Sequence, residues 1–324
     1  MKNHSEIVYL AWAPYNRRAE CFARELGAEL CLINYIKYRS PHLAPIKYPL
    51  MAIKTFWVLC QKKPKVVFSM TPPLFCVFFV YLYCLYSKAK YIIDAHTGSL
   101  VSQPWLTLRF LHKFLCRKAA VTVVTNPYLV NLIQSWGAKS IDMNPPVVFP
   151  KLSPKKLVGK HNVLFVNSFA PDEPLEEIVQ VARFFNEICF YITGDLSKAP
   201  KKTVGNAPKN VFFTGFVSNE EYIRLMTSVD GVLCFTTRDH TLLSGGEEAL
   251  FMGKPLLTFG FSFLKSFFNL GAVFVEPSIE AIRKGVVDLI QNRKKLSQEM
   301  MKLREIKLKN WGKDLIHLNK IICE

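Results

Sequence analysis

Short apolar runs alternate with longer amphipathic segments along the first half of the chain. The apolar runs have the length of strands and span residues 7–11, 30–34, 66–69, 91–94 and 121–125. The segments between them have helical length and spacing and span residues 17–27, 50–61, 73–86, 106–118 and 127–136. Strands that alternate with helices are typical of βαβ units on a parallel sheet. This half of the chain is therefore expected to form an α/β domain.

A proline-rich segment, residues 143–159, interrupts the alternation, which then restarts. The later expected strands are 163–167, 188–193, 211–214, 231–235, 255–259 and 272–275, and the expected helices are 174–186, 219–228, 246–252 and 278–291. We predict an α/β chain of two Rossmann-like, doubly wound domains, residues 1–145 and 161–293, joined by a linker over 146–160. One or two basic helices over 294–324 would pack back on the first domain. Such a pair of sheets would leave a ligand cleft between their carboxyl ends.

Composition indicates a folded protein with a basic first half. Half of the 324 residues are hydrophobic, which is enough for a large core. The net charge is +17, and residues 1–150 hold 18 Lys and Arg against 6 Asp and Glu. The positive electrostatic potential of such a basic region suits binding to an anionic membrane, a phosphorylated substrate or a nucleic acid. No nucleic-acid-binding motif is present, so a nucleic-acid partner is not expected.

Cysteine usage and the first residues point to the cytoplasm. The nine cysteines occur singly and mostly in apolar runs, which is typical of reduced core thiols. The N-terminal residues lack the pattern of a signal peptide. Residues 74–86 are uncharged, but this run is shorter than the roughly 20 residues that span a bilayer. We expect a buried helix there, with a membrane-inserted segment as the alternative.

The segment 236–259 carries the most informative chemistry of the chain. Gly245 and Gly246 stand at the start of a short predicted helix, where free N–H groups and the helix dipole favour an anion. Glu248 follows about half a turn later and could accept hydrogen bonds from a ribose. These features predict a nucleotide site. The chain has neither G-x-G-x-x-G after its first strand nor a P-loop, which disfavours dinucleotide oxidoreductases and P-loop NTPases.

Three stretches of the second domain resemble a known family. They are VFFTGFV at 211–217, the strand GVLCF at 231–235, and SGGEEALFMGKP at 244–255. Together they are similar to GT-B-fold glycosyltransferases of the glycogen-synthase-like and sucrose-synthase-like family. The resemblance covers most of the second domain and the first domain only in outline. It implies a glycosyltransferase that uses a nucleotide sugar, UDP- or GDP-linked.

The resemblance also implies roles for individual residues. Glu248 would bind the donor ribose, and the N–H groups of Ser244, Gly245 and Gly246 would hold the diphosphate. Phe216 and Val217 would line the nucleobase slot, and Asn167, Ser168 and Phe169 would lie beside the phosphates. Fixed N–H dipoles can stabilise a leaving diphosphate, so neither a metal nor another cofactor is expected.

The chain departs from the family pattern in two places. His240, with Asp239 beside it, stands where the family often has a second Glu that contacts the donor sugar. Asp239, His240 and Thr241 could contact the substrate or form a local hydrogen-bonded cluster. The loop 167–175 lacks the usual Arg and Lys pair, so the candidates to neutralise the phosphates are Arg238, Lys254 and Lys265.

Candidate catalytic groups lie in the first domain. Asp94 and His96 follow a predicted strand at its carboxyl end, a favoured place for catalytic residues. Either could act as a general base on an acceptor hydroxyl, and the pattern fits inverting and retaining enzymes alike. In the alternative reading, Asp94 caps the loop and His96 stands behind the site. Arg17 and Arg18 could hold an anionic acceptor or form a solvated face.

Basic and aromatic residues alternate over 35–65, a pattern that suits an anionic membrane interface or a merely basic surface. They are Tyr35, Lys37, Tyr38, Arg39, Lys47, Tyr48, Lys54, Phe56, Trp57, Lys62, Lys63 and Lys65. The resulting hypothesis is a metal-independent glycosyltransferase with a lipid-linked or glycan acceptor, in the cytoplasm or on the cytoplasmic face of a membrane. The alternative is a non-catalytic protein that binds a nucleotide sugar or an anionic lipid.

Overall fold

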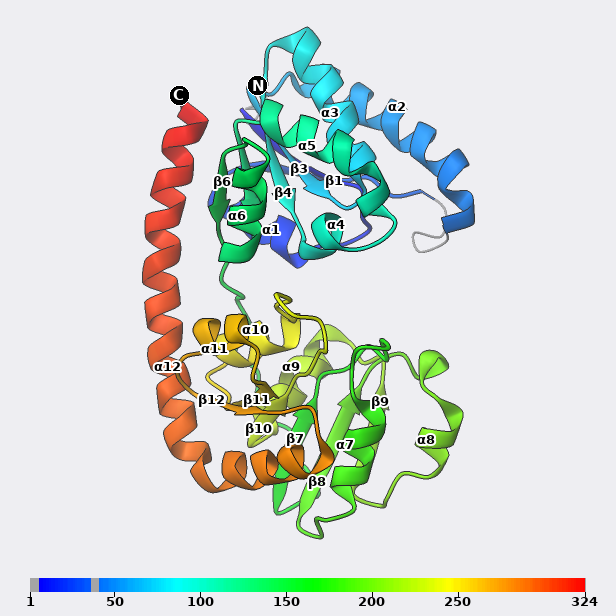
Figure 1. The fold of residues 1–324 in the computed structure, drawn as a ribbon, viewed down its shortest axis with the longest axis vertical. Helices are drawn as coiled ribbons and strands as arrows, with labels where there is room; N and C mark the ends of the chain where they lie inside the picture. The colour runs from blue at the N-terminus through cyan, green and yellow to red at the C-terminus, as the bar shows by residue number, and fades with distance from the viewer. Residues whose placement is uncertain (1–5, 36–40, 324) are drawn as a thin grey trace. The chain divides into compact units, whose positions relative to one another are not determined.

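The computed structural model describes residues 6–35 and 41–323. The chain forms two compact units (Figure 1). Unit 1 contains the residues up to Pro146 together with those from Asn310 onward, and unit 2 runs from Val147 to Lys309. Each unit is built on a six-stranded sheet in which all neighbouring strands are parallel.

The sheet of unit 1 has the strand order β2-β1-β3-β4-β5-β6. Its strands are β1 (Ile7–Ala11), β2 (Glu29–Leu32), β3 (Val66–Thr71), β4 (Lys90–Ala95), β5 (Val121–Val124) and β6 (Ser140–Asp142). Its helices are α1 (Arg17–Glu25), η1 (Pro41–Leu43), α2 (Ala44–Lys62), α3 (Leu74–Ser87), α4 (Thr97–Val101), η2 (Trp105–Leu108), α5 (Arg109–Lys118) and α6 (Pro127–Ser135). Apolar side chains of α2, α3, α5 and α6 pack in one core, and those of α1 pack in another core.

The sheet of unit 2 has the strand order β12-β11-β10-β7-β8-β9. Its strands are β7 (His161–Phe165), β8 (Ile188–Thr193), β9 (Val211–Gly215), β10 (Gly231–Leu233), β11 (Leu256–Phe259) and β12 (Ala272–Val275). Its helices are α7 (Leu175–Ala182), η3 (Leu196–Lys198), α8 (Lys201–Gly205), α9 (Asn219–Ser228), α10 (Ser244–Phe251), α11 (Ser262–Phe267) and the first part of α12 (Ile279–Cys323). The fold class is therefore the predicted one, two doubly wound α/β domains.

The last helix differs from the prediction. Residues 278–291 and 294–322 were expected to form separate helices, but α12 is one helix of 45 residues. The basic run at 293–295 does not break it, because buried apolar positions continue at helical spacing beyond that run. Met300 and Leu303 pack in a core of unit 2, and Trp311 and Leu318 pack with α1 in unit 1.

Other differences are local. Strand β6 and helices α4, α8 and α11 are short elements that the apolar pattern did not predict. Helix α2 begins at Ala44 rather than at residue 50, with a proline in its first turn, where the missing N–H costs nothing. The uncharged run forms α3, whose buried residues include Leu74, Val77 and Val80. Within residues 6–35 and 41–323, no helix combines the length and apolar character that a membrane crossing requires.

Candidate functional site

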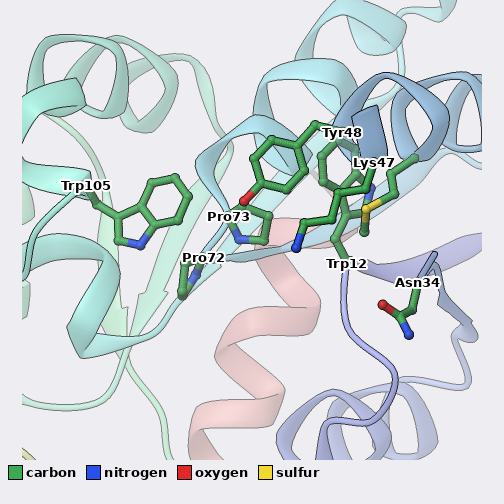
Figure 2. Close-up of a pocket in the computed structure, with 8 residues that line it drawn as sticks. Trp12, Asn34, Lys47, Tyr48, Pro72, Pro73 and Trp105 are labelled. Atoms are coloured by element: carbon green, nitrogen blue, oxygen red, sulfur yellow. The ribbon is translucent and has the colours of Figure 1, made fainter. Parts of the chain in front are cut away.

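Each sheet changes winding direction at one point, and open α/β sheets bind ligands beside such points. In unit 1 the change falls between β1 and β3, and in unit 2 between β7 and β10. The residues that follow β1 and β3 line a cavity in unit 1 (Figure 2). In unit 2 the loop after β7 and helix α10 (Ser244–Phe251), which follows β10, hold most of the residues predicted to bind a nucleotide.

The predicted anion-binding helix of unit 2 is α10, which begins at Ser244. A Cβ atom on Gly245 would lie 2.7 Å from Val166 Cβ, and one on Gly246 would lie 3.0 Å from Phe268 Cζ. Gly245 thus allows the helix start to approach the ends of β7 and β10 closely, and Gly246 allows it to approach Phe268 and Leu256 of β11. The carbonyl of Leu243 accepts the N–H groups of Gly246 and Glu247 at 3.0 and 3.3 Å.

Glu248 is the second part of this site. It is only 5% exposed, and its Oε2 atom accepts a hydrogen bond from the phenol of Tyr222 on α9. The phenol therefore fixes the orientation of the carboxylate one turn inside α10. Tyr222 was not predicted, because nothing in the sequence links α9 to a residue 26 positions later.

The loop after β7 holds Asn167 and Ser168, predicted to lie beside the phosphates. The carboxylate of Glu173 accepts the N–H groups of Ser168 and Ala170 at 2.8 and 3.0 Å, and the Ser168 hydroxyl at 3.1 Å. Asn167 Oδ1 accepts the N–H of Phe169 at 2.5 Å, and Phe169 adopts a left-handed φ of 59°. The Glu173 carboxylate of the same loop therefore binds the N–H and hydroxyl groups that were expected to donate hydrogen bonds to a phosphate.

Arg238 supplies a positive charge to this loop, which has none of its own. Its guanidinium pairs with Asp172 at 2.8 Å, and its side chain remains 59% exposed. The hydroxyl of Thr236 also donates to Asp172, at 2.5 Å. Arg238 therefore lies at the carboxyl edge of the sheet, as its predicted role requires. Lys265 is close to Gly260, just after β11.

Lys254 does not lie at this edge, which corrects the prediction for it. The residue precedes β11, so it lies at the amino edge of the sheet. Its ammonium group donates to the carbonyls of Thr227 and Val229 at 2.6 and 2.9 Å. Burial lowers the pKa of Lys254, while the charge of Asp230 opposes that shift. Lys254 holds the end of α9, because the turn after α10 carries it away from the start of that helix.

Residues 239–241 form a local hydrogen-bonded turn. Asp239 Oδ1 accepts the N–H of His240 at 2.6 Å, and the Asp239 carbonyl accepts the Thr241 hydroxyl at 3.3 Å. His240 has a left-handed φ of 57°. Thr241 nevertheless lines a narrow cavity with Thr236 and Gly246, which brings it to the start of α10. Phe216 follows β9 with its side chain 89% exposed, and Val217 is half-buried.

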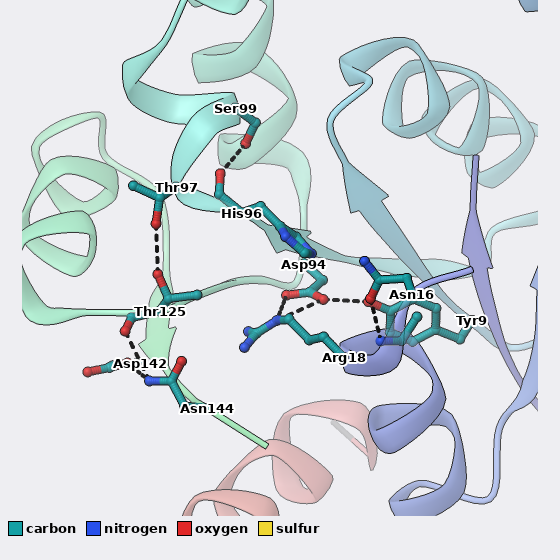
Figure 3. Close-up of polar contacts among 11 residues, drawn as sticks. Tyr9, Asn16, Arg18, Asp94, His96, Thr97, Ser99, Thr125, Asp142 and Asn144 are labelled. Atoms are coloured by element: carbon teal, nitrogen blue, oxygen red, sulfur yellow. Dashed lines mark hydrogen bonds and ion pairs between the residues drawn. The ribbon is translucent and has the colours of Figure 1, made fainter. Parts of the chain in front are cut away.

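In unit 1, Asp94 is fully buried near the end of β4 (Figure 3). Tyr9 on β1 donates its phenol to Asp94 Oδ2, and Arg18 Nε donates to Oδ1 at 2.8 Å. Burial, then the charge of Asp94, raises the pKa of Tyr9 well above its usual value. Asp94 thus anchors Arg18 and Tyr9, and both of its oxygens accept hydrogen bonds from them. Tyr9 was not predicted, because it lies inside an apolar strand.

His96 caps the short helix α4. Its N–H donates to the Thr71 carbonyl at 3.0 Å, and its carbonyl accepts the Ser99 hydroxyl at 2.7 Å. The Nε2 atom is buried and makes no hydrogen bond to the described part of the chain. Burial lowers the pKa of His96, the charge of Asp94 opposes this, and Arg18 reinforces it. The lowered pKa favours the neutral form of the imidazole.

Further polar residues of unit 1 lie at the start of α1 and at the ends of β4, β5 and β6. Arg17 begins α1 beside Arg18 and is half-buried. The Thr97 hydroxyl lies 3.0 Å from that of Thr125, whose carbonyl accepts the Asn144 amide at 2.9 Å. These contacts join the ends of β4, β5 and β6 (Figure 3). In the described residues no group of three or more His, Cys, Asp and Glu could hold a metal ion.

Comparison with known proteins shows the fold. No protein-family model and no curated protein sequence matches the chain. HepE from Anabaena, solved with UDP and glucose, matches with a TM-score of 0.70 at 10% identity, over 98% of each chain. Sucrose-phosphate synthase from Thermosynechococcus elongatus matches with a TM-score of 0.68 at 11% identity, over 97% of this chain and 87% of that one.

A third structure, a variant of S. aureus TarM solved with fondaparinux, α-GlcNAc-glycerol and UDP, has a TM-score of 0.66 at 13% identity. The match covers 85% of this chain and 59% of the TarM chain. These likenesses establish the GT-B fold that the sequence predicted.

Proposed function

We propose that the protein is a glycosyltransferase that moves a sugar from a nucleoside-diphosphate sugar to a glycan or lipid-linked acceptor. One observation carries the proposal. A buried, oriented carboxylate, Glu248, lies one turn inside a helix whose start packs against the ends of β7 and β10. A ribose and a diphosphate require these two elements side by side. The HepE and TarM complexes named above contain UDP, which favours uridine over guanosine in the donor.

The diphosphate would be held by groups that carry positive charge or N–H dipoles. The start of α10 offers the N–H groups of Ser244 and Gly245, and Arg238 offers an exposed guanidinium at the same sheet edge. As the donor bond breaks, charge grows on the leaving diphosphate, and fixed donors of this kind stabilise it. We therefore expect transfer without a metal ion.

Proton acceptance in unit 1 is assigned to His96 rather than Asp94. Both Asp94 oxygens accept hydrogen bonds from Tyr9 and Arg18, so this carboxylate positions its neighbours. His96 has a neutral imidazole with its Nε2 atom unused within the described residues. In the reaction the acceptor oxygen bonds to the sugar carbon, the donor carbon–oxygen bond breaks, and the acceptor proton passes to the imidazole.

Membrane attachment is proposed through one face of α2. Ile46, Leu50, Ile53 and Trp57 are exposed at helical spacing and are called the α2 apolar stripe here. Lys54 lies over the Trp57 ring at 3.6 Å, so a cation accompanies the stripe. An apolar face with a lysine beside it suits an anionic lipid surface.

Several other members of the predicted basic and aromatic set are buried, pack against the core or pair with a carboxylate. Tyr48 and Phe56 pack against the core, and Lys47 is buried. Lys62 pairs with Glu29 at 2.5 Å and Lys65 with Glu6 at 2.7 Å. Lys37, Tyr38 and Arg39 lie outside the described residues.

Nucleotide binding and turnover test the function. UDP in hundredfold excess over its Kd should stabilise the folded protein by about 2.7 kcal/mol, seen as a rise in Tm that GDP produces less strongly. UDP-sugars should then support transfer or slow donor hydrolysis in the presence of EDTA. UDP binding with no turnover of any donor would instead support the non-catalytic alternative. The absence of binding by either nucleotide would contradict both.

A further inference from the structure

The cavity of unit 1 has a volume of about 150 Å³ and lies at the winding change of the sheet (Figure 2). Trp12 enters it directly after β1, and Pro72 enters directly after β3. Lys47, Tyr48 and Met51 come from α2, and Trp105 comes from η2. Four segments far apart in sequence thus converge where such sheets bind ligands. The nucleotide site of unit 2 does not use any of these residues.

The aromatic walls of this cavity are held in place. Trp12 is fully buried, and its Nε1 atom donates to the Thr55 hydroxyl at 2.9 Å. The Tyr48 ring packs against Trp12 at 5.6 Å and against Phe75 at 5.5 Å. Flat, fixed rings bury apolar surface at little entropic cost. The C–H face of a pyranose ring offers a flat apolar surface of this kind.

The positive charge of Lys47 determines which ring-shaped ligands the cavity prefers. Lys47 is 5% exposed and lines the cavity, and its amine lies 5.8 Å from the centre of the Tyr48 ring. In Figure 2 the Lys47 side chain extends from α2 with its nitrogen pointing toward Pro73. A charge-assisted hydrogen bond is stronger where water is excluded. The amine therefore favours a ligand that carries a carboxylate or phosphate, and the exposed amide of Asn34 could bind hydroxyls.

The cavity also adjoins the assigned proton acceptor. Pro72 directly follows Thr71, whose carbonyl accepts the His96 N–H at 3.0 Å. Trp105 lies in the segment after α4, the helix that His96 caps. The ends of two neighbouring strands thus bring His96 next to the cavity wall.

The geometry points to this cavity as the acceptor site for an anionic saccharide, with its ring against Tyr48 or Trp105, which Trp12 supports from behind, and its acidic group on the Lys47 amine. This inference rests on the proposed function, because it names the acceptor class of the same reaction. It does not depend on the donor, so binding of the saccharide can be measured without one.

Glucose, glucuronic acid and glucose 6-phosphate are the probes, titrated into the full-length protein by ligand-observed NMR and calorimetry. Both anionic sugars should bind more tightly than glucose, while inorganic phosphate alone should bind more weakly than the sugar phosphate. Lys47→Met should weaken both anionic sugars by about tenfold or more and leave glucose unchanged. Trp105→Ala should weaken all three sugars. Lys54→Met, on the exposed face of the same helix, is the matched control and should have no effect.

UDP affinity is measured in parallel on every variant, which separates the two proposals, and urea denaturation of each variant shows that unit 1 is folded. Failure of UDP to bind would contradict the proposed function and leave the cavity assignment intact. Equal binding of glucose and the anionic sugars, or Lys47→Met with wild-type affinity for all of them, would overturn the cavity assignment. So would inorganic phosphate that binds as tightly as glucose 6-phosphate.

Discussion

The carboxylate of Glu173 accepts the backbone N–H of Ser168 at 2.8 Å, inside the loop that is expected to meet the donor phosphates. The same carboxylate accepts the N–H of Ala170 at 3.0 Å. An acidic side chain therefore occupies donors that a phosphate would use, and its charge opposes that phosphate. Nucleotide binding must either displace Glu173 or bring the phosphates against Arg238 and α10 alone.

Glu173→Gln should strengthen UDP binding by about threefold to tenfold. The amide oxygen can still accept the N–H of Ser168, so the loop keeps its shape while the repulsion between like charges disappears. Calorimetric titration with UDP measures the change. Glu177→Gln, which removes the same charge from α7, is the control and should change the affinity little. Weaker UDP binding by Glu173→Gln would show that the loop needs its carboxylate and does not meet the phosphates.

Glu248→Gln should weaken UDP binding by about tenfold to a hundredfold, since a hydrogen bond to a charged group contributes about 1.5–3 kcal/mol. Tyr222→Phe should have a smaller effect in the same direction, because it removes only the group that orients the carboxylate. Titrations with UDP and with its 2′- and 3′-deoxy analogues locate the contact. The wild type should lose affinity for at least one analogue, whereas Glu248→Gln should bind that analogue and UDP alike.

Glu247→Gln is the matched control for that experiment, one position earlier on the same helix. It should retain wild-type affinity for UDP. If Glu247→Gln and Glu248→Gln weakened UDP binding equally, the effect would come from the charge of the helix start, and the assignment of Glu248 to the ribose would fail.

The sequence predicted the strands well, since a buried parallel strand must be an apolar run. It missed β6, whose three residues contain one apolar side chain, Ile141. Glu248 could be predicted because its helix and the preceding glycines are contiguous in sequence. Its partner Tyr222, and the partner Tyr9 of Asp94, could not, because the fold alone brings those pairs together. Lys254 was predicted at the wrong edge of the sheet. The eight residues of α10 carry the chain from the carboxyl edge back to the amino edge before Lys254 is reached.

Asp94→Asn and His96→Gln should separate a positioning residue from a proton acceptor. Asp94→Asn leaves the part-buried Arg18 without its counter-charge, which should lower the free energy of unfolding by about 3 kcal/mol. Arg18→Met in the same chain should restore part of that stability, as measured by urea denaturation. His96→Gln should lower kcat with little change in stability or in UDP affinity. Full activity of His96→Gln would contradict its assignment as the proton acceptor.

Acid should destabilise the protein through His112. Burial lowers the pKa of His112 to about 4, and a hydrogen bond to the Ser99 backbone opposes that shift. An unfolded histidine titrates near pH 6.5, so between about pH 6.5 and 4 the unfolded state binds more protons than the folded state. The stabilisation is complete above pH 6.5 and falls by roughly 2 kcal/mol at pH 5. Urea denaturation at several pH values should show this slope.

His112→Gln should flatten that slope, whereas His42→Gln, at an exposed position, should not. An unchanged slope in His112→Gln would assign the acid sensitivity to other groups.

The α2 apolar stripe should bind anionic vesicles. Apolar contacts and lysine charge act together at such a surface, so the affinity should be higher for phosphatidylglycerol than for phosphatidylcholine and should fall with salt. Ile53→Ser and Trp57→Ser together remove two exposed apolar side chains and should weaken co-sedimentation with the vesicles severalfold. Ile316→Ser, at an exposed position on α12, should leave binding intact because it lies outside the stripe. If the stripe variant and the α12 variant sedimented equally with the vesicles, α2 would not be the membrane face. The variant should keep its affinity for UDP and for glucose 6-phosphate, because Ile53 and Trp57 line neither site.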